Sequence, residues 1–110
     1  MIRMTIKRTK TGDIQSFTMS GHADFADHGE DIVCAGASAV SIGTVNAIEV
    51  LTGVVAEANQ GKNGFLECSF PENPSGEVQG KVQLLLEAMV VSLQEIEKLY
   101  GQHIKITFKQ

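Results

Sequence analysis

Alternating apolar and polar residues near both ends of the chain predict β-strands. In residues 2–7 every second side chain is apolar, and residues 14–21, after a short Thr-Gly-Asp turn, place Phe17 and Met19 on one face. This period of two is typical of strands with one buried face, and two such runs joined by a short turn predict a hairpin. Residues 103–109 alternate in the same way and predict a final strand.

Apolar residues three and four positions apart predict a first helix in the middle of the chain. It runs from Cys34 to about Leu51, and Gly53 is expected to end it. Small residues on one side predict a thin face that another element can approach closely. This thin face consists of Gly36, Ala39, Gly43, Ala47 and Val50.

A second helix has the clearest periodicity in the sequence. Its apolar stripe is expected to lie in the core, and consists of Val78, Val82, Leu85, Met89, Leu93, Ile96 and Tyr100. We expect Asn73-Pro74 to start this helix and Gly101 to end it.

Between the helices, residues 54–60 and 65–70 predict a second hairpin across a glycine-rich loop. The elements then follow the order β-β-α-β-β-α-β. This order predicts an α+β fold, a two-layer sandwich in which a largely antiparallel sheet carries two helices on one face. The chain has no linker and no low-complexity segment, so we expect a single domain over residues 1–110.

Charge and hydropathy exclude several classes of protein. The formal net charge is −4 and no dense Lys/Arg cluster forms a basic groove, which argues against direct nucleic-acid binding. Apolar runs are broken by polar residues and the N-terminus lacks a signal-peptide pattern, so we expect a cytoplasmic protein with no membrane partner.

Cys34 and Cys68 are then expected to be free thiols. A domain of 110 residues is small enough to favour a homodimer.

The stretch of residues 21–35, GHADFADHGEDIVCA, concentrates the reactive side chains. Cys34 falls at the start of the first predicted helix, where unpaired N–H groups and the helix dipole stabilise a thiolate. The same N–H groups are expected to hold an oxyanion. Both a nucleophilic cysteine and a buried, inert one are consistent with this position.

A thiol nucleophile needs a base, and the sequence offers three histidines. His22, at the end of the second predicted strand, can lie beside the helix start, and Gly21 allows a sharp turn before it. His28, in the middle of the loop, is the weaker alternative, whereas His103 is expected to be solvated on the polar side of the last strand. Asp31 has two candidate roles, as the cap of the helix and as the carboxylate that orients the histidine.

Metal binding is the rival interpretation of the same stretch. The candidate ligands include every common zinc-binding type: His22, Asp24, Asp27, His28 and Cys34. However, the sequence has no CxxC or HExxH motif, and its acidic residues do not follow the spacing of a calcium loop. We therefore expect neither a metal nor another cofactor.

Residues 21–38, GHADFADHGEDIVCAGAS, closely resemble the signature of the ribosomal-processing cysteine proteases of Firmicutes and related bacteria. In that family a Gly-His-Ala element is followed, about a dozen residues later, by an acidic residue and Val-Cys-Ala-x-x-Ser. The predicted order of strands and helices also matches, so the resemblance extends over essentially the whole chain.

The resemblance implies a specific activity and a set of site residues. Family members are cytoplasmic homodimers that remove a short N-terminal extension from a large-subunit ribosomal protein, cutting after an aromatic-rich sequence, and this removal is needed for functional ribosomes. By position, Cys34 is the expected nucleophile and His22, rather than His28, the general acid and base. Asp31, Ser38 and Gly21 are expected in supporting roles, and the segment between His22 and Cys34 is expected to form a mobile flap over bound peptide. A non-catalytic module for ribosome binding or assembly, with an unreactive Cys34, is the alternative.

Overall fold

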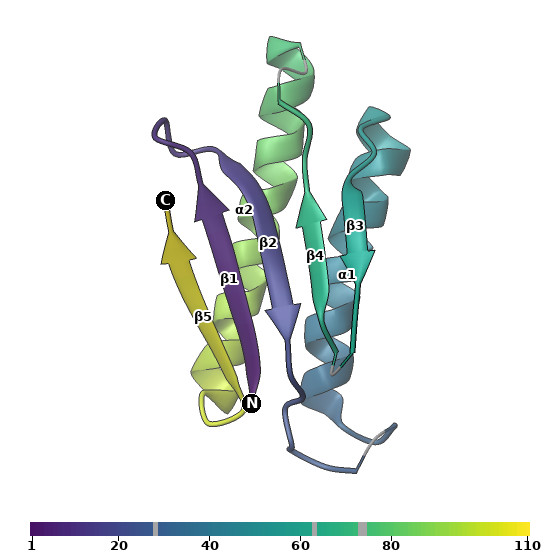
Figure 1. The fold of residues 1–110 in the computed structure, drawn as a ribbon, viewed down its shortest axis with the longest axis vertical. Helices are drawn as coiled ribbons and strands as arrows, with labels where there is room; N and C mark the ends of the chain where they lie inside the picture. The colour runs from purple at the N-terminus through teal and green to yellow at the C-terminus, as the bar shows by residue number, and fades with distance from the viewer. Residues whose placement is uncertain (28, 63, 73–74) are drawn as a thin grey trace.

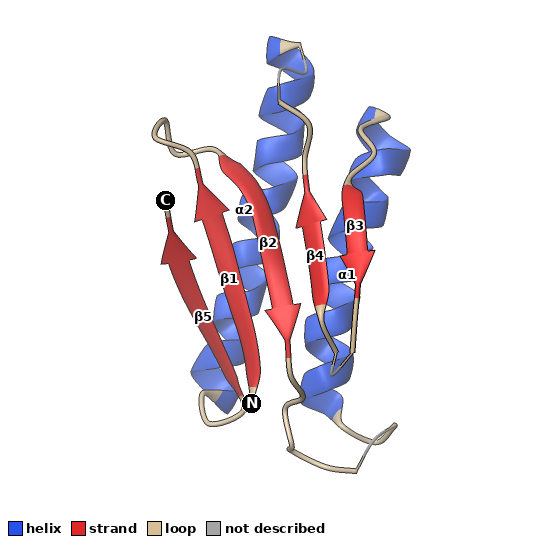
Figure 2. Cartoon of the chain, in the orientation of Figure 1, coloured by secondary structure: helices blue, strands red, loops and turns tan. Residues whose placement is uncertain are grey.

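The computed structural model describes residues 1–27, 29–62, 64–72 and 75–110. In this part of the chain the strands and helices follow the predicted order, and Figure 2 shows them as one sheet with two helices. Their bounds are β1 (Ile2–Arg8), β2 (Ile14–Ser20), α1 (Ile32–Thr52), β3 (Glu57–Gln60), β4 (Leu66–Ser69), α2 (Gly76–Tyr100) and β5 (Ile104–Lys109). The α+β class and the element order are therefore confirmed.

The strands form a single sheet in the order β3-β4-β2-β1-β5. All neighbouring pairs are antiparallel except β1 and β5, which run parallel and pair Met4 with Ile106. Both helices lie on the same face of the sheet, with α1 behind β3 and β4 and α2 running behind the rest (Figure 1). The predicted sandwich of a largely antiparallel sheet and two helices is thus confirmed.

The core lies between the sheet and the helices. Alternate residues of β1 and β2 point into it, among them the fully buried Met4, Ile6 and Phe17. From the helix side, α2 contributes Val82, Leu86, Met89, Val90 and Leu93. All seven residues of the predicted α2 stripe therefore lie in or against the core, as the spacing of three and four residues requires.

The first helix differs from its prediction in its start and in its buried side. It begins at Ile32, two residues before Cys34, and ends at Gly53, which adopts the left-handed φ of +78° and donates its N–H to Glu49. Of the predicted thin face, Ala39, Gly43 and Ala47 line a groove shared with α2, whereas Val50 is 81% exposed. The residues that α1 buries are Val33, Ala37, Ser41 and Ile48.

The strands of the second hairpin are shorter than predicted, whereas the predicted end of the second helix at Gly101 is confirmed. The third strand covers only Glu57–Gln60 of the expected residues 54–60. The helix α2 follows Ser75 as its N-cap residue and ends before Gly101, whose φ of −62° is right-handed. The predicted start at Asn73-Pro74 lies outside the described residues.

By length and composition alone, α1 qualifies as a membrane-crossing helix, since its most apolar 18-residue window has a mean hydropathy of 1.4. The expectation that no segment would qualify is therefore wrong by this criterion. Mostly buried core helices pass the same test, but only 22% of this window is buried. The residues Val33, Ala37 and Ile48 of α1 pack on the core.

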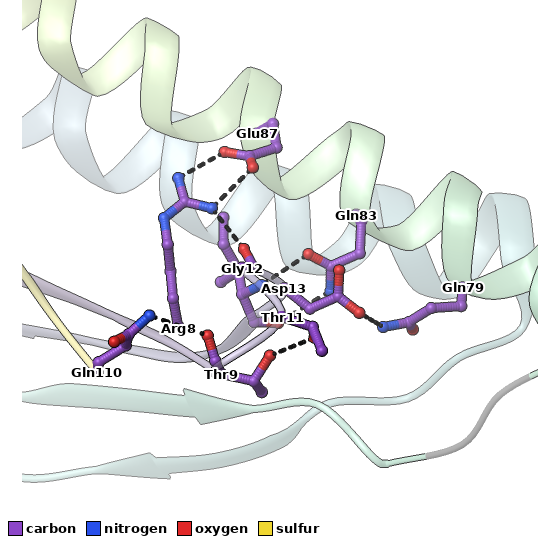
Figure 3. Close-up of polar contacts among 10 residues, drawn as sticks. Arg8, Thr9, Thr11, Gly12, Asp13, Gln79, Gln83, Glu87 and Gln110 are labelled. Carbon is purple, nitrogen blue, oxygen red and sulfur yellow. Dashed lines mark hydrogen bonds and ion pairs between the residues drawn. The ribbon is translucent and has the colours of Figure 1, made fainter.

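Polar contacts fix the turn between β1 and β2 to α2 (Figure 3). The Arg8 guanidinium donates to both carboxylate oxygens of Glu87, at 2.7 and 2.8 Å. The Gln83 carboxamide accepts from the Ile14 N–H at 2.7 Å and donates to the Ile14 carbonyl at 2.9 Å. This turn lies at the opposite end of the sheet from the loop between β2 and α1 (Figure 1), so the contacts hold the scaffold without touching that loop.

Candidate active site

All five residues named by the family resemblance line one pocket. It lies where β2 ends and α1 begins, beside the turn between β3 and β4, and has a volume of about 550 Å³. The five are Gly21, His22, Asp31, Cys34 and Ser38. The fold therefore brings together residues that the sequence spreads over eighteen positions, from 21 to 38.

Asp31 organises the start of α1. One carboxylate oxygen accepts from the N–H groups of Val33 and Cys34, at 2.9 and 3.0 Å. The other accepts from Phe25 and Ala26, at 2.9 and 3.2 Å. The predicted role of Asp31 as helix cap is thus confirmed, and the same side chain also ties the preceding loop to the helix.

These contacts also keep Asp31 ionised. Removal of the carboxylate from water favours its neutral form, but the four backbone N–H donors outweigh that effect and lower the pKa of Asp31 below its ordinary value. Its negative charge at neutral pH is therefore stabilised by the residues that it holds in place.

Cys34 is the third residue of α1 and is half-buried at the pocket wall. Its Sγ accepts a hydrogen bond from the Ala23 N–H at 3.2 Å, so a backbone donor from the loop faces the sulfur. The expectation that N–H groups at the helix start would be open to an oxyanion is wrong for three of them. Val33 and Cys34 donate to the Asp31 side chain, and Ala35 donates to the Asp31 carbonyl.

His22 lies exposed at the mouth of the pocket, and glycines on two segments shape its surroundings. Gly21 has a φ of +82°, and a Cβ there would collide with the Met1 carbonyl. Gly64, in the turn between β3 and β4, has a φ of +69°. A Cβ there would lie 2.6 Å from the Gly21 carbonyl oxygen and 3.4 Å from Cε1 of His22.

Gly64 is the site-shaping residue that the sequence did not reveal. The glycine-rich loop at residues 61–64 predicted a turn. Its contact with the end of β2 depends on the pairing of β4 with β2, which places two segments far apart in the sequence side by side. The glycine itself was the only available signal.

His103 is not the solvated residue that its position in the sequence predicted. It is half-buried, and its ring Nδ1 lies 2.9 Å from the Ala23 carbonyl oxygen. Phe25 packs edge to face against its ring, with centroids 5.3 Å apart. The prediction fails because His103 lies just before β5, in the turn after α2, where the loop carrying Ala23 covers it.

The remaining candidates of the acidic loop show no metal cluster. Among residues 1–27, 29–62, 64–72 and 75–110, no three His, Cys, Asp or Glu side chains gather in a way that could hold an ion. Asp24 instead lies 3.4 Å from the N-terminal amino group and has a left-handed φ of 56°. His28, the alternative base and candidate ligand, lies outside the described residues.

Comparison with known proteins gives consistent matches over nearly the full length of the chain. The family model described as cysteine protease Prp matches residues 1–105. The chain is 45% identical over 108 residues to the ribosomal processing cysteine protease Prp of Bacillus subtilis, covering 97% of this chain and 96% of that protein. It is 41% identical to the protein of the same name from Staphylococcus aureus, covering 99% and 100%.

A crystal structure shows the same fold. It is that of an essential ribosomal processing protease Prp from S. aureus in complex with a covalently linked product peptide. It superposes with a TM-score of 0.89 at 40% identity, covering 99% of this chain and all of that one.

Proposed function

The chain belongs to the family of the cysteine protease Prp, and from that premise we propose that it removes the short N-terminal extension of a large-subunit ribosomal protein. The cut follows an aromatic-rich sequence, and the trimmed protein then enters the ribosome. The observation that carries this proposal is the shared pocket of Cys34 and His22, a thiol and an imidazole brought to one surface by a loop and a helix start.

In the proposed mechanism His22 accepts the proton of the Cys34 thiol, and the thiolate attacks the scissile carbonyl carbon. The tetrahedral intermediate collapses as His22 donates that proton to the leaving amine, which leaves a thioester on Cys34. His22 then accepts a proton from water, the resulting hydroxide attacks the thioester, and the carboxylate product leaves as the thiol is restored.

The Ala23 N–H is the backbone donor that we assign to charge developing next to the sulfur. It already points at Sγ, whereas the helix-start donors of Val33 and Cys34 are occupied by Asp31. A donor that is fixed in advance at the sulfur stabilises the negative charge of the thiolate without a reorganisation step. Asp31 keeps the loop and the helix start together, and Ser38 lines the pocket one turn after Cys34. The segment between His22 and Cys34 is proposed to cover the bound peptide as a flap that stays anchored at Ala23, Phe25 and Ala26.

We further propose that the protein is a cytoplasmic homodimer. Large apolar side chains remain exposed on both helices: Ile42, Val50, Leu51, Leu84, Val91 and Leu99. A second copy would remove part of this surface from water, which favours association. Light scattering during gel filtration is expected to give twice the mass of the 110-residue chain, and a monomer at micromolar concentration would contradict the dimer.

The test of the function is incubation of the protein with the full-length precursor, followed by mass spectrometry of the products. We expect one cut at the end of the extension, no cut with Cys34→Ala, and normal cutting with Cys68→Ala, which removes the other thiol. Binding of the precursor without any product would instead identify a non-catalytic module. A cut elsewhere in the precursor would keep the protease and overturn the substrate.

A further inference from the structure

The loop that carries His22 is connected to the far end of α2 through a second histidine. His103 Nδ1 lies 2.9 Å from the Ala23 carbonyl oxygen, across 80 residues of sequence. A carbonyl oxygen only accepts hydrogen bonds, so the proton of this bond resides on Nδ1 of His103. The imidazole therefore acts here as a donor to the backbone.

Ala23 links this donor directly to the thiol. Its carbonyl accepts from His103 while its N–H donates to Sγ of Cys34 at 3.2 Å. Ala23 itself is 1% exposed, so water has little access to replace either bond. The next residue, Asp24, has a left-handed φ of 56°, a conformation that a non-glycine residue keeps only where its surroundings fix it.

His103 is well suited to hold Ala23, because its own backbone is fixed on both sides. Its N–H donates to the Tyr100 carbonyl at 2.8 Å, and its carbonyl accepts from the Ile2 N–H at 2.9 Å. The Phe25 ring packs edge to face on both His103 and Tyr100, with centroids 5.3 and 5.4 Å apart. The end of α2 and the start of β1 thus form a rigid mount for the loop.

We propose that His103 is a positioning residue for the nucleophile, which acts by holding the Ala23 amide against Cys34 Sγ. Without the His103 hydrogen bond the Ala23 backbone turns more freely, and its N–H spends less time directed at the sulfur. The thiolate and the charge formed in attack then lose a fixed donor. The inference rests on the proposed role of Cys34 as nucleophile, and it adds a residue that lies outside the pocket wall.

The test compares two nearly isosteric replacements, His103→Asn, which keeps an N–H donor near the Nδ1 position, and His103→Leu, which has none. The readout is the rate of iodoacetamide alkylation of Cys34 between pH 5 and 10, measured by peptide mass spectrometry. We expect His103→Leu to lower the rate at pH 7 about fivefold and to shift the profile to higher pH, as loss of one hydrogen bond predicts. His103→Asn is expected to stay close to wild type.

One further variant separates the effect of the hydrogen bond from that of ring packing, and another is a control at a neighbouring position. His103→Phe keeps a ring against Phe25 but has no donor, so it is expected to behave like His103→Leu. Gln102→Ala, at the exposed neighbouring position, is expected to match wild type. With a cleavable peptide, the loss in the donor-less variants is expected in kcat, with little change in KM.

The proposal is overturned if His103→Leu or His103→Phe retains the wild-type alkylation profile. It is also overturned if His103→Asn lowers the alkylation rate of Cys34 as much as His103→Leu does. Circular dichroism shows which variants fold, and the folded ones decide the comparison. Alkylation needs no substrate, so failure of the precursor to be cut would refute the proposed substrate without affecting this result.

Discussion

The substitution Gly64→Ala tests whether the turn between β3 and β4 shapes the candidate active-site pocket. The new Cβ would lie 2.6 Å from the Gly21 carbonyl oxygen, and real Cβ atoms essentially never approach closer than 3.0 Å. The turn and the end of β2 must therefore separate by about 0.4 Å or more. Both obstacles, Gly21 and Cε1 of His22, belong to the segment that presents the proposed base.

Two costs add up for this variant. An alanine at φ of +69° costs about 1–2 kcal/mol of folding free energy, because its Cβ crowds the backbone in the left-handed region. The forced contact with backbone atoms adds about 1–3 kcal/mol, as other overpacked sites do. We therefore expect Gly64→Ala to lower the free energy of unfolding by about 2–5 kcal/mol, and to lower kcat about tenfold, since shifts of 1 Å in catalytic groups cost up to about 10²-fold.

The assay is urea denaturation together with peptide cleavage, and Gly12→Ala is the matched control. Gly12 also has a left-handed φ, of +94°, but a Cβ there meets nothing within 4 Å, so only the backbone cost applies. We expect the control to lose about 1–2 kcal/mol of stability with unchanged kcat. Equal losses of stability and activity in the two variants would refute the proposed contact.

Three further results are expected. Asp31→Asn should be less stable than wild type at neutral pH. The difference between their urea midpoints should shrink as the pH falls below about 4, because an Asp31 carboxyl with a lowered pKa contributes stability only while it is ionised. A difference that stays constant with pH would contradict this. Burial and a neighbouring carboxylate raise the pKa of Cys68, so iodoacetamide should label it more slowly at pH 7 than Cys34, and faster labelling would show that the core opens. A double-mutant cycle of Arg8→Gln and Glu87→Gln should give a coupling free energy of unfolding of about 0.5–1 kcal/mol, and this coupling should fall in 1 M salt. A coupling free energy of zero would mean that the ion pair does not stabilise the turn between β1 and β2.

The strands β1 and β2 and the second helix could be predicted because each has one buried face and a clear period. Met4 and Ile6 alternate with polar residues, and Val82, Met89 and Leu93 recur at helical spacing, so the pattern itself marks the core side. The first helix lacked this contrast. Small and apolar residues occur on every face of this helix. Which of them are buried, such as Ala37, and which are exposed, such as Ala39, depends on how the helix packs.

The site was predictable in part for a similar reason. Asp31 precedes a helix in the position of a cap, and this local rule predicted its role as the N-cap, one of its two candidate roles, correctly. The roles of Gly64 and His103 depend on which strands pair and which loop covers which turn. Such contacts join residues tens of positions apart and leave no periodic signal in the sequence.

The role of Cys34 as nucleophile is tested most directly by stopping the reaction with the precursor by acid quench and measuring the intact mass of the enzyme. We expect a covalent adduct equal to the acyl part of the extension, located on Cys34 by peptide mapping and absent from Cys34→Ala. An adduct on another residue, or product formed by Cys34→Ala at the wild-type rate, would contradict it.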